Sequence, residues 1–109
     1  DNSTTNGWFN LLDEKTKSLA VDYFGLTEEE GYTKGFVRGA MNTVSNTCIV
    51  SMQDLLDLDE SARMNLPGSS EGNWEWRLLP DQINSEVASD LHRMTYLSGR
   101  LPIENQENE

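Results

Sequence analysis

The sequence predicts an α/β chain that is mostly helical when isolated and that forms part of a larger array of helices and strands. Three observations lead to this prediction. Apolar residues repeat with helical periodicity in three stretches, one short run has the composition of a buried strand, and only 36% of the 109 residues are hydrophobic. A single strand cannot form a sheet, because its unpaired edges need neighbouring strands. The low apolar content predicts a thin core that further segments would complete.

Two helices are expected in the first half of the chain. Residues 1–7 are polar and predict a loop, and a helix is expected over about residues 10–24, where Gly25 ends it. Thr27, followed by three glutamates, has the pattern of a helix cap with acidic residues in the first turn. A clearer helix is expected over about residues 32–45. Its apolar stripe consists of Phe36, Val37, Ala40, Met41 and Val44.

The second half of the chain begins with the predicted strand. Residues 47–52 (TCIVSM) are rich in β-forming types and lack alternation, which favours a buried strand of a parallel sheet. Residues 53–58 predict a turn of helix, and residues 65–73 contain the proline and glycines of a loop. A last helix is expected over about residues 81–98, and residues 104–109 are expected to form a polar tail. The apolar stripe of this helix consists of Ile83, Val87, Leu91, Met94 and Leu97.

The charge balance excludes several functions. The chain has 19 acidic and 8 basic side chains and a net charge of −11, whereas binding to nucleic acid or to an anionic membrane needs clustered Lys and Arg. No apolar run approaches the ~18 residues of a membrane span. Cys48 is the only cysteine, so no internal disulfide is possible and a cytoplasmic location is expected. Because the chain begins with Asp1 rather than Met, we expect a processed protein or a piece of a longer one.

Four short motifs are too specific to be ordinary connecting sequence. They are DNSTTNGW at residues 1–8, MQDLL at 52–56, ARMNLPG at 62–68 and GNWEWRL at 72–78. In this order they resemble the C-terminal end of the amylomaltase family, the bacterial 4-alpha-glucanotransferases of glycoside hydrolase family 77. The chain differs from the family pattern where Ser51 replaces a proline and where Asp57 replaces a glycine, so a change in the local turn is expected there.

The resemblance implies a (β/α)8 TIM barrel of which this chain is the C-terminal part, with the last helical layers and strand eight. Residues 1–103 are then the C-terminal segment of the catalytic barrel, and residues 104–109 are its tail. Sites in such barrels lie on the loops that follow the carboxyl ends of the strands. Asp1, Gln53 and Asp54 are expected at such positions.

The resemblance also implies a reaction. Family members transfer α-1,4-glucan segments between maltooligosaccharides or to glucose, without a metal or organic cofactor. Their retaining double displacement needs a carboxylate nucleophile and a second carboxyl group as acid and base. Asp1 matches the third family carboxylate, which stabilises the transition state. Because the nucleophile and the acid/base are missing from the sequence, the isolated chain is expected to be inactive.

Asn65, Asn2 and Trp8 are the expected sugar-binding residues. A side-chain amide offers two donors and an acceptor to neighbouring hydroxyl groups, and an indole ring can stack on the face of a sugar. Trp74 and Trp76 are instead expected to pack in the core or at an interface.

These roles have structural alternatives. Asp1 could be an exposed acid, and Asn65 could only stabilise its own loop. Arg63 and Arg77 are expected to form structural ion pairs, with Asp54 as a candidate partner. His92 has no Cys or acid at ligand spacing, so no metal site is expected.

Two other functions fit the sequence. One is a non-catalytic maltooligosaccharide-binding module, which predicts cooperative unfolding and sugar binding by the chain alone. The other is an acidic protein-interaction domain whose net charge of −11 meets a basic partner. That function predicts salt-dependent binding to the partner and no affinity for sugar.

Overall fold

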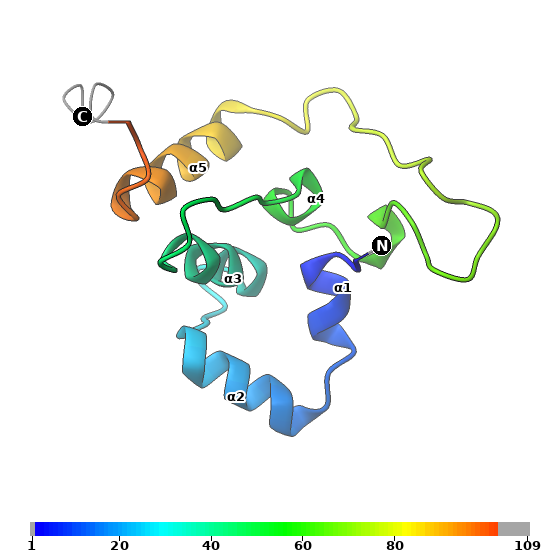
Figure 1. Ribbon diagram of the computed structural model, residues 1–109, viewed down its shortest axis with the longest axis horizontal. Helices are drawn as coiled ribbons and strands as arrows, with labels where there is room; N and C mark the ends of the chain where they lie inside the picture. The colour runs from blue at the N-terminus through cyan, green and yellow to red at the C-terminus, as the bar shows by residue number, and fades with distance from the viewer. Residues whose placement is uncertain (1, 103–109) are drawn as a thin grey trace.

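Helices are the regular elements of the described chain. The computed structural model describes residues 2–102, so Asp1 and the tail predicted at 104–109 lie outside it (Figure 1). The order is α1 (Thr5–Asn10), α2 (Glu14–Phe24), α3 (Tyr32–Met41), α4 (Met52–Leu55), the 3-10 turn η1 (Glu60–Ala62) and α5 (Ser85–Leu97). The prediction of a mostly helical chain is confirmed. Within the described part, no helix has both the length and the apolarity needed to cross a membrane.

The first predicted helix, over about residues 10–24, corresponds to α2, and the structure has a further helix, α1, before it. The Thr4 hydroxyl accepts a hydrogen bond from the N–H of Gly7 at 3.1 Å and begins α1 within the predicted loop. The Asp13 carboxylate accepts from the N–H of Thr16 at 2.7 Å and begins α2. Both caps satisfy N–H groups that have no partner within their helix, so they set the boundaries in place of the apolar periodicity. Gly25 ends α2 with a φ of 65°, as predicted.

The cap of α2 makes the stability of this helix depend on pH. Hydrogen bonds from the hydroxyl and the N–H of Thr16 lower the pKa of Asp13 below its ordinary value. A lowered pKa means that the stabilisation is present above the unfolded pKa of about 3.9 and is lost as the pH falls through the lower folded value. We therefore expect hydrogen exchange of the first α2 amides to accelerate below about pH 4 relative to the intrinsic rate.

The matched control for this prediction is Asp13→Asn, because asparagine caps helices about as well and does not titrate. Its α2 amides are expected to show no such acid-induced loss of protection. Equal pH profiles for the two proteins would contradict a role for the Asp13 charge.

The prediction of a strand at residues 47–52 is wrong. Residues 47–51 are irregular, and Met52 begins α4 because the Ser51 hydroxyl accepts from the N–H of Asp54 at 3.2 Å. A strand needs a neighbour that receives its N–H and C=O groups, and residues 2–102 contain no other strand. Ile49 is 90% exposed, so this segment is not buried within the described chain either.

α3 lies at the centre of the fold, where it contacts α1, α2, α4 and α5 (Figure 1). Its Phe36 ring packs against the rings of Trp8, Phe9 and Phe24, with centroids 5.0 to 5.6 Å apart. The buried apolar side chains of the described chain are Phe9, Leu26, Val37, Met41 and Ala62. This small core, centred on α3, agrees with the amphipathic stripe and the thin core that the sequence predicts.

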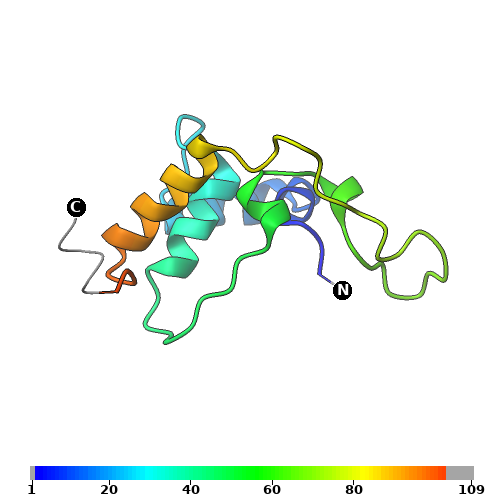
Figure 2. The same ribbon diagram turned by 90° about the horizontal axis from the view of Figure 1, so that it is seen from above.

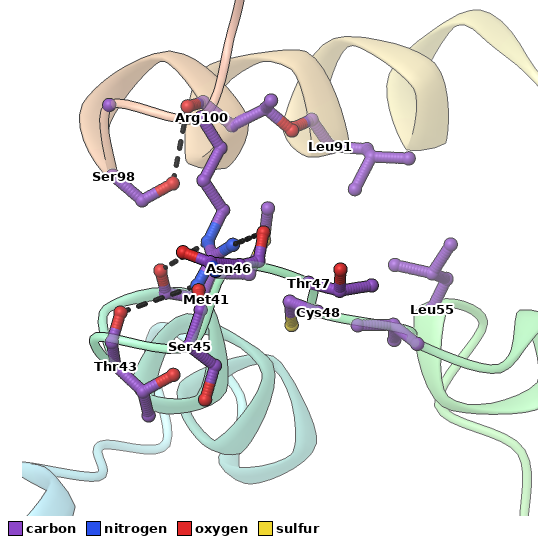
Figure 3. A pocket seen from close by; sticks show the side chains of 13 residues that line it. Met41, Thr43, Ser45, Asn46, Thr47, Cys48, Leu55, Leu91, Ser98 and Arg100 are labelled. Carbon is purple, nitrogen blue, oxygen red and sulfur yellow. Dashed lines mark hydrogen bonds between the residues drawn. The ribbon is translucent and has the colours of Figure 1, made fainter.

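Arg100 joins the end of α5 to the end of α3 (Figure 3). Its guanidinium donates to the carbonyls of Met41 and Ser45 at 2.8 Å, of Thr43 at 3.3 Å and of Asn46 at 3.4 Å. The chain leaves α3 by turning around this group, so the helix ends at Met41 and not near residue 45 as predicted. Arg100 also lines an open hollow of about 730 Å³ between α5 and the segment that follows α3.

Residues 63–84 form a long irregular segment between η1 and α5. Figure 2 shows this segment reaching away from the helices before it returns to α5. Asn73 organises its turn, because its side chain accepts from the N–H of Leu66 at 2.8 Å. Asn84 then caps α5 by accepting from the N–H of Val87 at 2.9 Å, so the helix begins later than predicted.

Candidate functional site

A polar cleft lies beside the start of α1, where all four sequence motifs meet. It has a volume of about 510 Å³, and its walls include residues 2–5, Asp54, Arg63, Met64 and Trp74. A second hollow of about 420 Å³ shares Asn2, Ser3, Thr5 and Arg63 with it and extends to Trp8. α1 contacts η1, and the start of α1 lies close to α4 (Figure 1). Segments about fifty residues apart in the sequence therefore form one site.

Asp54 joins α4 to the first residue of α1. Its two carboxylate oxygens accept from the N–H of Thr5 at 2.8 Å and from the hydroxyl of Thr5 at 2.7 Å. The first N–H groups of a helix have no acceptor within it, so Asp54 supplies one from a distant part of the chain. This contact fixes the direction in which residues 2–4 leave α1.

Asp57 holds the same helix from its other side. Its Oδ1 accepts from the Asn6 side chain at 2.9 Å and from the Thr33 hydroxyl at 2.5 Å. Asp57 has a φ of 55°, a left-handed conformation that glycine and, less often, aspartate adopt. Asp57, where the family pattern has glycine, thus adopts a left-handed turn and links α1 to α3.

Arg63 connects three segments at the floor of the cleft. Its Nη1 donates to the Ser3 hydroxyl at 3.0 Å and to Glu60 Oε1 at 2.9 Å, and its Nε donates to the Asn65 carbonyl at 3.0 Å. Arg63 forms the expected ion pair, but with Glu60. The prediction of Asp54 as its partner was wrong. Asp54 instead accepts from Thr5, which lies nearer to it in the folded chain.

η1 carries Glu60 into this site, and Asp59 begins the turn. The Asp59 carboxylate accepts from the hydroxyl of Ser61 at 2.6 Å and from its N–H at 3.0 Å. These bonds lower the pKa of Asp59 below its ordinary value. The Glu60 Oε2 atom is buried and has no hydrogen-bond partner within the described chain.

The predicted site residues lie in different surroundings. Asp1 is outside the described residues. Asn2 lines both hollows and is exposed, and Trp8 is 45% exposed and packs on Phe36. Asn65 is half-buried and lines a separate hollow of about 760 Å³ in the 65–75 loop, and its carbonyl accepts a hydrogen bond from the cleft residue Arg63.

The two tryptophans that were expected to pack differ from each other. Trp76 is half-buried, whereas Trp74 is 61% exposed, lines the cleft and has a φ of 61°. The N–H of Trp74 donates to the carbonyl of Met64, which closes the loop between them. Trp74 therefore does not pack in a core within the described chain, because this hydrogen bond holds its backbone at the edge of the cleft.

The sequence missed the roles of Ser3, Thr5 and Asp57. The repeated hydroxyl residues of DNSTTNGW were the available signal, since Ser and Thr beside a helix start are common hydrogen-bonding partners. Within residues 2–102, no group of three His, Cys, Asp or Glu side chains is placed to bind a metal. The arrangement offers hydroxyl, amide and guanidinium groups in one open cleft, which are the groups that bind polyhydroxylated ligands.

Comparison with known proteins gives the class of protein first: carbohydrate-active enzymes of a glycoside hydrolase family. The family model described as 4-alpha-glucanotransferase matches residues 1–82. The chain belongs to glycoside hydrolase family 77, the family of 4-alpha-glucanotransferases, as its resemblance predicted.

Individual relatives agree with this assignment. The chain is 45% identical over 101 residues to a 4-alpha-glucanotransferase of Clostridium butyricum, covering 92% of this chain and 21% of the relative. It is 40% identical over 100 residues to the 4-alpha-glucanotransferase of Synechocystis sp., covering 92% of this chain and 20% of the relative. The chain therefore spans about a fifth of the length of these relatives.

A solved structure matches the fold. The structure of the amylomaltase from Streptococcus agalactiae in complex with acarbose is similar to this chain, with a TM-score of 0.90 and 35% identity. The match covers 94% of this chain and 21% of that one. The arrangement of helices described above is therefore that of the corresponding part of an amylomaltase.

Proposed function

We propose that this chain supplies the C-terminal part of the (β/α)8 catalytic barrel of a 4-alpha-glucanotransferase. The observation that carries the proposal is the cleft at the start of α1, where the four family motifs meet and which Asp54 and Arg63 organise. In this proposal residues 1–103 belong to the barrel and residues 104–109 form its tail. The rest of the barrel is the structural partner of the chain and covers its exposed apolar side chains, such as Ile49 and Leu11.

The reaction we propose is transfer of α-1,4-glucan segments between maltooligosaccharides or to glucose. A glycosyl-enzyme forms on a carboxylate elsewhere in the barrel, and a sugar hydroxyl then takes the glycosyl group. Asp1 stabilises the positive charge that develops in the transition state, because a fixed negative charge acts most strongly there. Asn2, Asn65 and Trp8 contact the sugars. The family assignment and the position of Asn2 and Trp8 along the cleft walls support these roles.

The charge and the cysteine content of the chain fit the proposed substrate and location. The ligands are neutral sugars, so the −11 charge of the chain does not oppose them as it would oppose a nucleic acid or an anionic membrane. The single cysteine supports a cytoplasmic location. The reaction needs no metal or organic cofactor, because carboxyl groups perform both of its chemical steps.

The test compares the 109-residue chain with a protein that also carries the sequence preceding residue 1. We expect the longer protein to convert maltotriose to glucose and longer maltooligosaccharides, and we expect the 109-residue chain to give no product. Glucose release and chromatography of the oligosaccharides measure both. The proposal fails if the longer protein is inactive on maltotriose, maltoheptaose and amylose. Activity of the 109-residue chain alone would show that the remaining barrel is not needed.

A further inference from the structure

The Arg63 side chain is held more firmly than a surface arginine. It is 17% exposed, although it lines both hollows beside α1. Arginine is seldom this well buried unless its donors are used, and here they reach a hydroxyl, a carboxylate and a carbonyl at 2.9 to 3.0 Å. The group is thus part of the protein framework and also part of the cleft wall.

Two of these acceptors, Ser3 and Asn65, lie on segments that carry the proposed sugar contacts. Ser3 directly follows Asn2 and lies two residues from Asp1, and Asn65 is itself a proposed contact. Arg63 holds the Ser3 hydroxyl with Nη1 and the Asn65 carbonyl with Nε, although these residues are about sixty positions apart. A single planar group therefore sets the distance between the two segments.

Glu60 fixes the orientation of that group. Its Oε1 accepts from the same Nη1 at 2.9 Å, and Glu60 lies on η1, which Gln53 holds in turn through the carbonyl of Ala62 at 3.2 Å. The guanidinium is rigid and planar, whereas a lysine ammonium is a point charge on a flexible stem. Lysine at this position keeps the charge and loses the fixed separation of the two donor nitrogens.

We propose that Arg63 is a positioning residue for glucan transfer: it holds Ser3, and with it the segment that contains Asn2, at a fixed distance from Asn65. This inference rests on the proposed function, because it assigns Arg63 a purpose in that reaction. The proposed role of Asp1, which precedes Asn2 in the sequence, is to stabilise the transition state. A residue that positions this segment is therefore expected to act on kcat more than on the KM of the donor.

The experiment uses the active enzyme that contains this chain, with the variants Arg63→Lys and Arg63→Met. We expect both to lower kcat on maltotriose by roughly 10- to 100-fold, the range that a displacement of about 1 Å produces. The KM is expected to change by less than about threefold. The matched control is Arg93→Met, which removes an exposed arginine from α5 and is expected to leave kcat unchanged.

Two further variants separate positioning from a purely structural role. Ser3→Ala removes one acceptor, so it is expected to lower kcat in the wild-type enzyme and to have no added effect in Arg63→Met. Arg63→Ala is expected to regain part of its kcat when millimolar methylguanidinium is added, whereas Arg93→Ala is expected not to respond. An Arg63→Lys enzyme with normal kcat would overturn the proposal, and so would additive effects of Ser3→Ala and Arg63→Met.

Hydrogen exchange gives a result that does not depend on activity. Amides of residues 3–9 and 64–66 are expected to lose protection in Arg63→Lys and to keep it in Arg93→Met. If the enzyme itself is inactive on glucans, the proposed function fails, while unchanged exchange in Arg63→Lys would overturn the positioning role separately. If Arg63→Met does not fold, Arg63→Lys and Ser3→Ala still decide the question.

Discussion

Replacing Asp54 by alanine is expected to release the first turn of α1 from α4. The carboxylate accepts two hydrogen bonds from Thr5, at 2.8 and 2.7 Å, and both are partly buried. Hydrogen bonds to charged groups contribute about 1.5–3 kcal/mol each, so the opening free energy of α1 is expected to fall by about 3 kcal/mol. Hydrogen exchange of the α1 amides in the active enzyme measures this change.

Two controls test the cause of this effect. Thr5→Val removes the hydroxyl and keeps the N–H donor, so about half of the loss is expected. Asp90→Ala breaks only an ion pair with Lys34 at 3.1 Å, in which both side chains are 40% exposed or more. Such pairs contribute about 0–1 kcal/mol. If Asp54→Ala costs no more than Asp90→Ala, the link between α4 and α1 does not have the proposed importance.

Replacing Gly7 by alanine is expected to destabilise the same region, against the usual trend. In a helix interior this change normally stabilises by about 1 kcal/mol. At Gly7 the new Cβ would lie 3.1 Å from the Glu60 Cα and closer still to the Glu60 carboxylate. Because backbone atoms of η1 cannot move aside without moving Arg63, we expect a net loss of about 2 kcal/mol in the free energy of unfolding.

Gly7→Ala is expected to lower the free energy of unfolding, whereas the same change in an ordinary helix interior raises it. Ser18→Ala, at an exposed position within α2, serves as the control and is expected to change the free energy of unfolding by less than about 0.5 kcal/mol. Urea unfolding of the wild type, Gly7→Ala and Ser18→Ala measures the three free energies of unfolding. A Gly7→Ala variant that is more stable than wild type would mean that α1 and η1 are not in the close contact described above.

The sequence predicted the elements with strong local signals. The stripe of α3 and the stop at Gly25 depend on side chains that are close in the chain. The stop at Gly25 is confirmed, and so are Val37 and Met41 as buried members of the stripe, whereas Val44 lies beyond the end of α3 and is exposed. The caps at Thr4 and Asp13 are local too, but the apolar spacing across residues 10–24 concealed them. The strand at 47–52 failed for another reason: its composition suits a sheet, and a sheet requires chain that lies outside these residues.

The motifs located the site, and only the structure shows how it is joined. Spacing within DNSTTNGW and ARMNLPG gives no indication that Ser3 meets Arg63, because that contact spans sixty positions. The same holds for Thr5 with Asp54. The sequence correctly made Arg63 a member of an ion pair and chose the wrong acid, since several acids lie within a few residues of it. Long-range hydrogen bonds between polar side chains have no periodic signature from which they can be predicted.

Arg100 binds the end of α3. The position of α5 therefore does not depend on the length of the segment that precedes this helix. The segment that ends α5 is held by the hydrogen bonds from Arg100 to four carbonyls. The irregular residues 63–84 therefore do not need to determine where the helix lies. Insertions or deletions at the tip of that segment are therefore expected to reshape one rim of the cleft while the helical framework stays in register.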